Sequence, residues 1–113
     1  MSKFDEKMAI YKQSVADLKL QISDDLLAKV AKGLGPSIYL ADASLVSGSD
    51  AKELETVKNN FLIKKLGLAD GPELDKALQS ALTAMGTSNK SKHRAIFYAL
   101  LVKHFGKESV YST

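Results

Sequence analysis

Basic side chains gather around the last helical segment that the sequence predicts, where they could bind an anion. Lys90, Lys92 and Arg94 lie near its start, and Lys103 and Lys107 lie near its end. Cations at a helix N-terminus oppose the helix dipole, whereas the free N–H groups there attract anions. We therefore expect replacement of the first three cations by Gln to leave folding stability equal or slightly higher. The five cations are the candidate anion-binding residues.

Charge is unevenly distributed along the chain. Residues 1–56 contain seven basic and nine acidic residues, a net charge of −2, whereas residues 57–113 contain nine basic and four acidic residues, a net charge of +5. No acidic residue lies between Asp75 and Glu108. This asymmetry favours an anionic partner, namely RNA, DNA or an acidic protein surface. The competing interpretation is a solvated basic link, because no aromatic residue alternates with the cations at 90–94.

A second candidate site is the irregular connection at residues 36–48. Tyr39, Asp42 and Ser44 are its candidate binding residues, with Ser47 beside them, because loops on rigid scaffolds often carry binding groups. The alternative is a buried elbow that closes the bundle. That alternative is favoured by the apolar neighbours Ile38, Leu40, Leu45 and Val46.

Other reactive residue types lack the spacing that their chemistry needs. His93 and His104 are eleven residues apart, a rise of about 16 Å along a helix, which is too far for one shared metal ion. The chain has no cysteine, no G-x-S-x-G turn and no glycine-rich phosphate loop. The acidic pairs lie in or near first turns of predicted helices, where carboxylates favour the dipole. We expect no enzyme activity, metal or cofactor.

Size and composition predict a single helical domain over residues 1–113. The chain is 45% hydrophobic, enough for one core and too short for two ordinary domains. The absence of cysteine suits a reducing compartment, so the cytoplasm is the expected location. The longest apolar run, residues 95–102, is eight residues long, and Asp5 and Glu6 replace the basic start of a standard signal peptide. We expect neither export nor a membrane span.

Helix start and stop residues predict an all-α bundle of five main helices. The expected helices are 2–19, 23–33, 50–66, 72–85 and one that ends at about 105, with a short helical or irregular connection at 36–48. Ser23 and Asp50 are the expected N-caps, and Glu53 has the spacing of a reciprocal capping box with Asp50. Gly33 and Gly67 are expected stops, as are Gly86 and Gly106.

Apolar periodicity predicts which faces are buried. The fifth helix is apolar nearly all round and is expected to be central, and Phe61 and Leu101 are expected core residues. In the third helix, Ile63 is expected to pack on Leu68 in a Schellman ending. The fourth helix is expected to bury Leu74, Ala77, Leu78, Ala81, Leu82 and Met85.

Nearly the whole chain resembles a known bacterial family. The similar strings are Ser44-Leu45-Val46, Ser49-Asp50, Glu53-Leu54, Thr56-Val57, Asn60-Phe61-Leu62, Lys64-Lys65-Leu66-Gly67-Leu68, Phe97-Tyr98 and His104-Phe105-Gly106-Lys107. From about residue 8 to residue 107, the chain resembles the domain-of-unknown-function family DUF2853. The resemblance implies a compact helical bacterial protein, and it assigns no activity, ligand or partner to any residue.

These observations favour a non-catalytic interaction or structural module, which binds a protein partner or a second copy of itself. The alternative function is binding of an anionic partner through the basic C-terminal helix. The two hypotheses differ in salt dependence. Association through an apolar patch is insensitive to salt, whereas binding of a polyanion weakens steeply as salt rises.

Overall fold

The protein is all-α, as its sequence predicts. The computed structural model describes residues 3–40, 45–46, 50–86 and 92–111. Within these ranges the α-helices are α1 (Lys3–Asp17), α2 (Asp24–Leu34), α3 (Ala51–Val57), α4 (Pro72–Met85) and α5 (Arg94–His104), and the shorter helical segments are η1 (Gly35–Tyr39), η2 (Lys58–Ile63) and η3 (Glu108–Tyr111). No strand forms among the described residues. Extended pairing there is confined to an isolated antiparallel bridge between Leu45 and His93.

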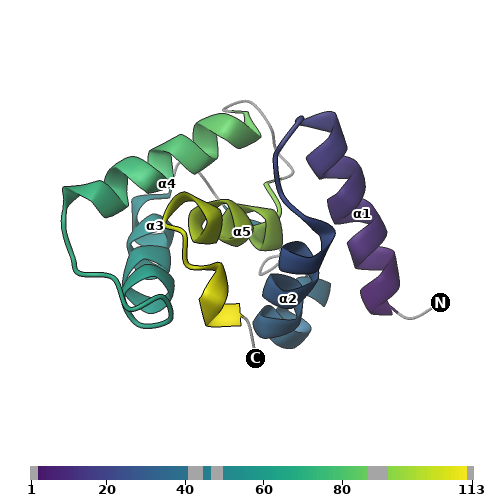
Figure 1. Cartoon of the computed structure of the whole chain (residues 1–113), viewed down its shortest axis with the longest axis horizontal. Helices are drawn as coiled ribbons and strands as arrows, with labels where there is room; N and C mark the ends of the chain where they lie inside the picture. Colours follow the sequence, from purple (N-terminus) through teal and green to yellow (C-terminus); the bar gives the residue numbers. More distant parts are fainter. Residues whose placement is uncertain (1–2, 41–44, 47–49, 87–91, 112–113) are drawn as a thin grey trace.

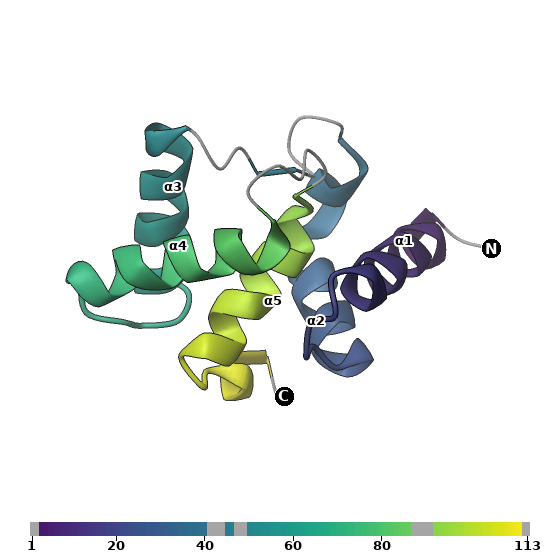
Figure 2. The ribbon, with the colours of Figure 1, turned by 90° about the horizontal axis from the view of Figure 1, so that it is seen from above.

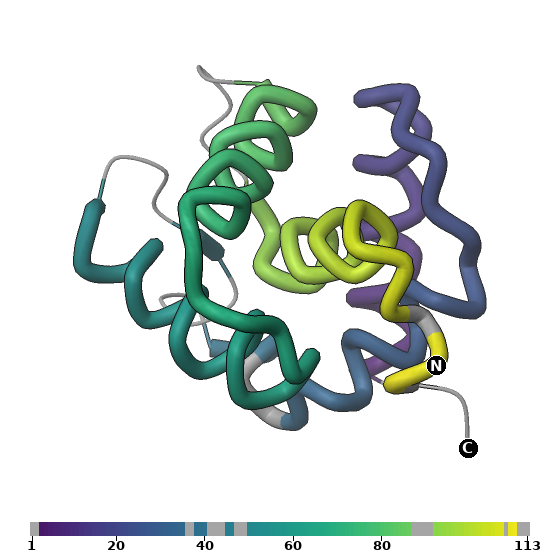
Figure 3. The backbone as a smooth tube through the Cα atoms, turned by 60° about the vertical axis from the view of Figure 1, so that its left-hand side comes forward, coloured from purple at the N-terminus to yellow at the C-terminus, as the bar shows by residue number. Residues whose placement is uncertain are grey.

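The fifth helix lies in the middle of the molecule. Figure 1 shows α5 between α1 and α2 on one side and α3 and α4 on the other, and Figure 2 shows the same order from above. Figure 3 views α5 nearly along its axis, with the other helices around it. Contacts of α5 with α1, α2 and α4 agree with this arrangement. The expectation of a central fifth helix is confirmed.

The core is built mainly from α5 and the inner faces of α2 and α4. Phe97 and Leu101 of α5 are fully buried, and Phe61 of η2 is nearly so. These findings confirm Phe61 and Leu101 as core residues. All six apolar residues expected on the inner face of α4 are buried, whereas Asp75, Lys76, Gln79 and Thr83 on its other face are exposed. The period of 3.6 residues thus identified the α4 faces correctly.

Side-chain caps begin two of the helices where the sequence predicts them. Ser23 accepts a hydrogen bond from the Leu26 backbone N–H at 3.2 Å, and Asp50 accepts one from the Lys52 N–H at 3.0 Å. The helix α4 begins with Pro72, whose missing N–H costs nothing in a first turn. These caps fix the starts of α2, α3 and α4.

The expected stop at Gly33 is wrong. The helix α2 continues through Gly33 to Leu34, and Gly35 is the residue with the left-handed backbone, at φ 66°. The reason is Pro36, because the residue before a proline is disfavoured in the α region and a helix therefore ends before it. Gly33 stays in the last turn, where a glycine costs about 1 kcal/mol relative to alanine.

A π-helical segment continues α3, and the sequence analysis did not predict it. In and after η2, backbone hydrogen bonds span five residues, from Lys64 N–H to Asn59 O at 3.3 Å and from Leu66 N–H to Phe61 O at 2.9 Å. Gly67 ends the segment at φ 72°, as expected. The Leu68 N–H, however, donates to Leu62 O, which lies one residue earlier than a Schellman ending requires.

The connection at 36–48 combines both conformations that the sequence left open. Its first part is the 3₁₀ segment η1, and its described second part is extended, because the Val46 N–H donates to Lys92 O at 2.8 Å. This bond holds the connection against the residues that precede α5.

Candidate binding groove

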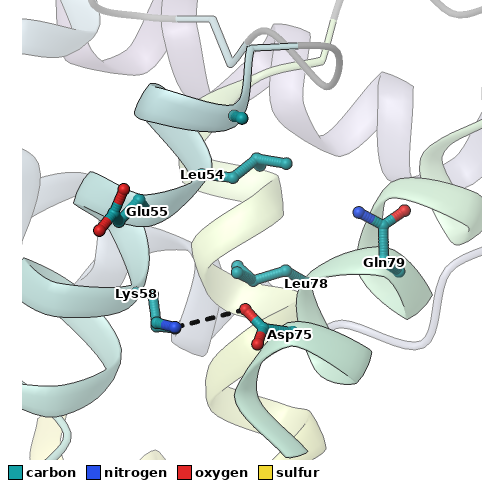
Figure 4. A pocket seen from close by; sticks show the side chains of 7 residues that line it. Leu54, Glu55, Lys58, Asp75, Leu78 and Gln79 are labelled. Atoms are coloured by element: carbon teal, nitrogen blue, oxygen red, sulfur yellow. Dashed lines mark hydrogen bonds and ion pairs between the residues drawn. The ribbon is translucent and has the colours of Figure 1, made fainter. Parts of the chain in front are cut away.

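A groove open to solvent lies between α3 and α4. It has a volume of about 280 Å³ and is lined by Ala51, Leu54, Glu55, Lys58, Asp75, Leu78 and Gln79. We call it the α3–α4 groove. Figure 4 shows Leu54 and Leu78 extending into the space between the two helices, with Lys58 and Asp75 at one end. Two helices thus provide an apolar floor and a polar rim.

Lys58 lies at the charged end of the α3–α4 groove. Its Nζ lies 3.5 Å from Asp70 Oδ1, in the link before α4, and 3.5 Å from Asp75 Oδ1, in the first turn of α4. Burial alone would lower the pKa of Lys58, but the carboxylates of Asp70 and Asp75 outweigh it and raise the pKa above its usual value. Lys58 is therefore a cation, and it ties η2 to the start of α4.

Arg94 joins α5 to α3 through a partly buried ion pair. Its Nη2 lies 2.6 Å from Glu53 Oε1, and the Arg94 and Glu53 side chains are only 17% and 23% exposed. Arg94 Nη1 also donates to the Tyr98 hydroxyl at 3.2 Å. The Tyr98 ring stacks on Phe61, with centroids 4.0 Å apart. The sequence predicted that Glu53 would complete a capping box with Asp50. In the structure, its carboxylate contacts Arg94.

The four candidate anion-binding cations that the structure describes lie in different environments. Lys92 is only 9% exposed, and Arg94 pairs with Glu53. Lys103 is exposed and donates to the Gln21 carbonyl. The nine residues from Arg94 to Lys103 turn a helix by about 900°, so these two side chains leave α5 on opposite sides. Lys107 is half-buried beyond α5, and Lys90 lies outside the described residues. Anion binding by this set stays a prediction.

Lys103 borders a second groove, between α4 and α5. This α4–α5 groove has a volume of about 180 Å³, and its lining residues are Ala77, Ser80, Ala81, Ala84, Leu100, Lys103 and His104. All of them belong to the part of the sequence that has no acidic residue. The rim of this groove is therefore basic, in contrast to that of the α3–α4 groove.

The candidate loop site is described only at Tyr39. That side chain is 39% exposed, and the neighbouring Leu40 is 59% exposed. Asp42 and Ser44 lie outside the described residues, as does Ser47. A binding role for this loop stays a prediction.

The two histidines occupy different environments. His93 packs edge-on against Tyr11 of α1, with ring centroids 5.3 Å apart. Burial, and then the positive charge of Lys7, lower the pKa of His93. Burial, followed by the neighbouring Tyr39, raises the pKa of Tyr11 to about 12. His104, at the other end of α5, contacts the Phe105 ring. In the described part of the chain, no three His, Cys, Asp or Glu residues are grouped so that they could hold a metal ion.

Comparison with protein families places most of the chain in one of them. Residues 10–109 match the model of a family described as "Protein of unknown function (DUF2853)". The chain belongs to this family. No curated protein matches it significantly. Membership in DUF2853 therefore supports the resemblance drawn from the residues and assigns no activity or ligand.

The α3–α4 groove was not predicted from the sequence. Leu54 and Leu78 are part of ordinary apolar stripes, and Lys58 and Asp75 are ordinary surface charges in a helical pattern. The groove exists because the link at 64–71 brings α4 into contact with η2, the continuation of α3. No local pattern encodes that pairing.

No helix in the described ranges combines the length and the apolar character that a membrane crossing requires.

Proposed function

We propose that this DUF2853 protein is a non-catalytic interaction module, and that its α3–α4 groove receives apolar side chains of a partner protein. The apolar floor of that groove is the observation that carries the proposal. Leu54 is only partly covered and lies beside the buried Leu78, at the base of a groove open to solvent. Apolar side chains of a partner would remove this surface from water, which stabilises a complex.

The rest of the molecule supports a binding role. Arg94 pairs with Glu53 and Lys58 pairs with Asp75, each between two helical elements, so these charged groups stabilise the fold and are not arranged for catalysis. The absence of cysteine suits a protein that acts in the cytoplasm, which we include in the proposal.

A variant that fills the groove tests this function. Ala51 is exposed and lines the α3–α4 groove, so Ala51→Trp would occupy the groove without enlarging a buried side chain. Ala9→Trp, at an exposed position of α1, is the matched control. The probe is a synthetic amphipathic helical peptide with a leucine stripe, titrated while the amide shifts of the protein are followed by NMR.

We expect the peptide to shift the amide signals of α3 and of the first half of α4. Ala51→Trp should weaken binding at least about tenfold, the factor that corresponds to 1.4 kcal/mol. Ala9→Trp should leave it unchanged. Peptide binding that Ala51→Trp does not affect would rule out the groove as the binding surface.

The anionic partner is a second candidate, favoured by the basic rim of the α4–α5 groove. Its test is a titration with single-stranded RNA at several salt concentrations. Three phosphate contacts would give a slope of about −2 in a plot of log affinity against log salt. The variant Lys103→Gln should reduce both the affinity and the slope. No binding of wild type at about 50 mM salt, where such contacts are strongest, would remove this candidate.

A further inference from the structure

The rim of the α3–α4 groove carries more negative than positive charge. Glu55 and Asp75 line the groove, and Lys58 is its one lining cation among the described residues. Asp70 does not line the groove but forms an ion pair with Lys58. The Asp70 and Asp75 side chains are 69% and 64% exposed although both contact Lys58. Their carboxylates therefore remain accessible to a second cation.

We propose that the α3–α4 groove receives a basic amphipathic helix of a partner protein. An apolar side chain of that helix covers the partly exposed Leu54, and a lysine or arginine beside it pairs with Asp70 and Asp75. This inference rests on the proposed function of the groove and adds the chemistry of its partner.

Charge complementarity selects this partner over an acidic one. A partner carboxylate at the charged end of the groove would face the two carboxylates of Asp70 and Asp75 and the one ammonium of Lys58, and like charges brought together across an interface oppose binding. A guanidinium can donate two parallel hydrogen bonds to one carboxylate, which adds geometric specificity. The same rim therefore attracts a basic helix and repels an acidic one.

Lys58 sits where the partner's cation would bind. Its Nζ lies 3.5 Å from each of two carboxylates, so it competes with an incoming lysine or arginine for the same oxygens. Removal of the Lys58 charge should consequently tighten the complex while it removes two ion pairs from the free protein. A purely structural role for Lys58 would lower binding and stability together.

The experiment compares two helical peptides with the same leucine stripe, one with lysine and one with glutamate on the polar face. Binding is measured by fluorescence anisotropy at about 50 mM and about 300 mM salt, because screening separates charge from apolar contact. The lysine peptide should bind at least about tenfold more tightly than the glutamate peptide at low salt, and the ratio should shrink at high salt.

Variants of the rim make the test specific. Asp75→Asn should weaken binding of the lysine peptide about three- to tenfold. Glu73→Gln is the matched control, because Glu73 is also an exposed acid in the first turn of α4 but does not line the groove. Lys58→Met, which keeps the aliphatic stem, should tighten binding of the lysine peptide. Circular dichroism melts confirm that each variant is folded.

The outcomes separate this inference from the proposed function. If the glutamate peptide binds as tightly as the lysine peptide, and Ala51→Trp abolishes both interactions, the groove is a binding site and the basic partner is wrong. If Ala51→Trp affects neither peptide, the proposed function also fails. Self-association of wild type that Ala51→Trp abolishes would assign the groove to a second copy and overturn the partner helix.

Discussion

The Arg94 guanidinium and the Glu53 carboxylate lie 2.6 Å apart and connect α5 to α3 across 41 residues of sequence. Both side chains are largely covered, so the pair is shielded from water more than an ordinary surface ion pair. Loss of one member would leave the other charge poorly solvated. The contact therefore stabilises the position of α3 beside the centre of the bundle.

We expect Arg94→Gln to lower the free energy of unfolding by about 1 to 3 kcal/mol, since hydrogen bonds to charged groups contribute about that much. Urea denaturation of the variant measures the loss. From the sequence, replacement of the cations at the start of α5 was expected to leave stability equal or slightly higher, because only the helix dipole was considered and not Glu53. The loss of stability expected here has the opposite sign. Lys52→Gln, an exposed lysine of α3, is the control, with an expected change within about 0.5 kcal/mol. A double-mutant cycle with Glu53→Gln should show coupling; additive losses would contradict the pair.

Large core side chains should be costly to truncate. We expect Phe61→Ala and Leu101→Ala each to destabilise the protein by about 2 to 5 kcal/mol, because both side chains are buried. Leu40→Ala, at a side chain that is 59% exposed, should change stability by less than about 0.5 kcal/mol. Thermal and urea melts of the three variants provide the comparison. Equal losses at Leu40 and Leu101 would show that the assignment of buried faces is wrong.

Acid should weaken the packing of α1 on the start of α5. The pKa of His93 is lower in the folded protein than in the unfolded chain, where it is about 6.5. The unfolded state therefore binds a proton first, and stability is lost as the pH falls through about 6.5 toward the folded value. Urea melts between about pH 7.5 and pH 5 should show a larger loss for wild type than for His93→Gln. Lys7→Gln should reduce the loss, because the second cause of the low pKa is removed. An NMR titration in which the His93 pKa lies above 6.5 would contradict this prediction.

Removal of a buried hydroxyl should be harmless or stabilising. Among the described residues, the fully buried Tyr11 hydroxyl has no hydrogen-bond partner. Burial of an unpaired hydroxyl costs about 1 to 3 kcal/mol, so Tyr11→Phe should leave stability equal or raise it by about 1 kcal/mol. Differential scanning calorimetry measures the change. A loss of more than about 1 kcal/mol would indicate a hydrogen bond from one of the segments that the structure does not describe.

The helix boundaries were predictable where a side chain or a proline marks them. Ser23 and Asp50 bind backbone N–H groups at the expected starts, and Pro72 opens α4. Of Gly33 and Gly35, only Gly35, which precedes Pro36, ends α2. The proline therefore determined the end of the helix more than the glycine did. The π turns of η2 carry no comparable mark, because a hydrogen bond that spans five residues requires no particular residue type.

Contacts between distant segments were the main gap in the sequence analysis. Lys92 was expected to bind an anion or to lie in a solvated link, since lysines are almost always exposed. The structure buries it beside the 36–48 connection, where its carbonyl accepts a hydrogen bond from the Val46 N–H. The partner of Arg94 and the two walls of the α3–α4 groove also come from different helices. Periodicity identifies which face of a helix is buried, but it does not identify the helix that covers it.

The central place of α5 has a consequence for synthesis of the protein. The helices α1, α2 and α4 pack on α5, and all three precede it in the chain. During synthesis, the apolar faces of α1, α2 and α4 are therefore completed before α5, which covers them. Exposed apolar surface makes such incomplete chains prone to aggregation. The core can therefore close around α5 only after residue 104 has left the exit tunnel.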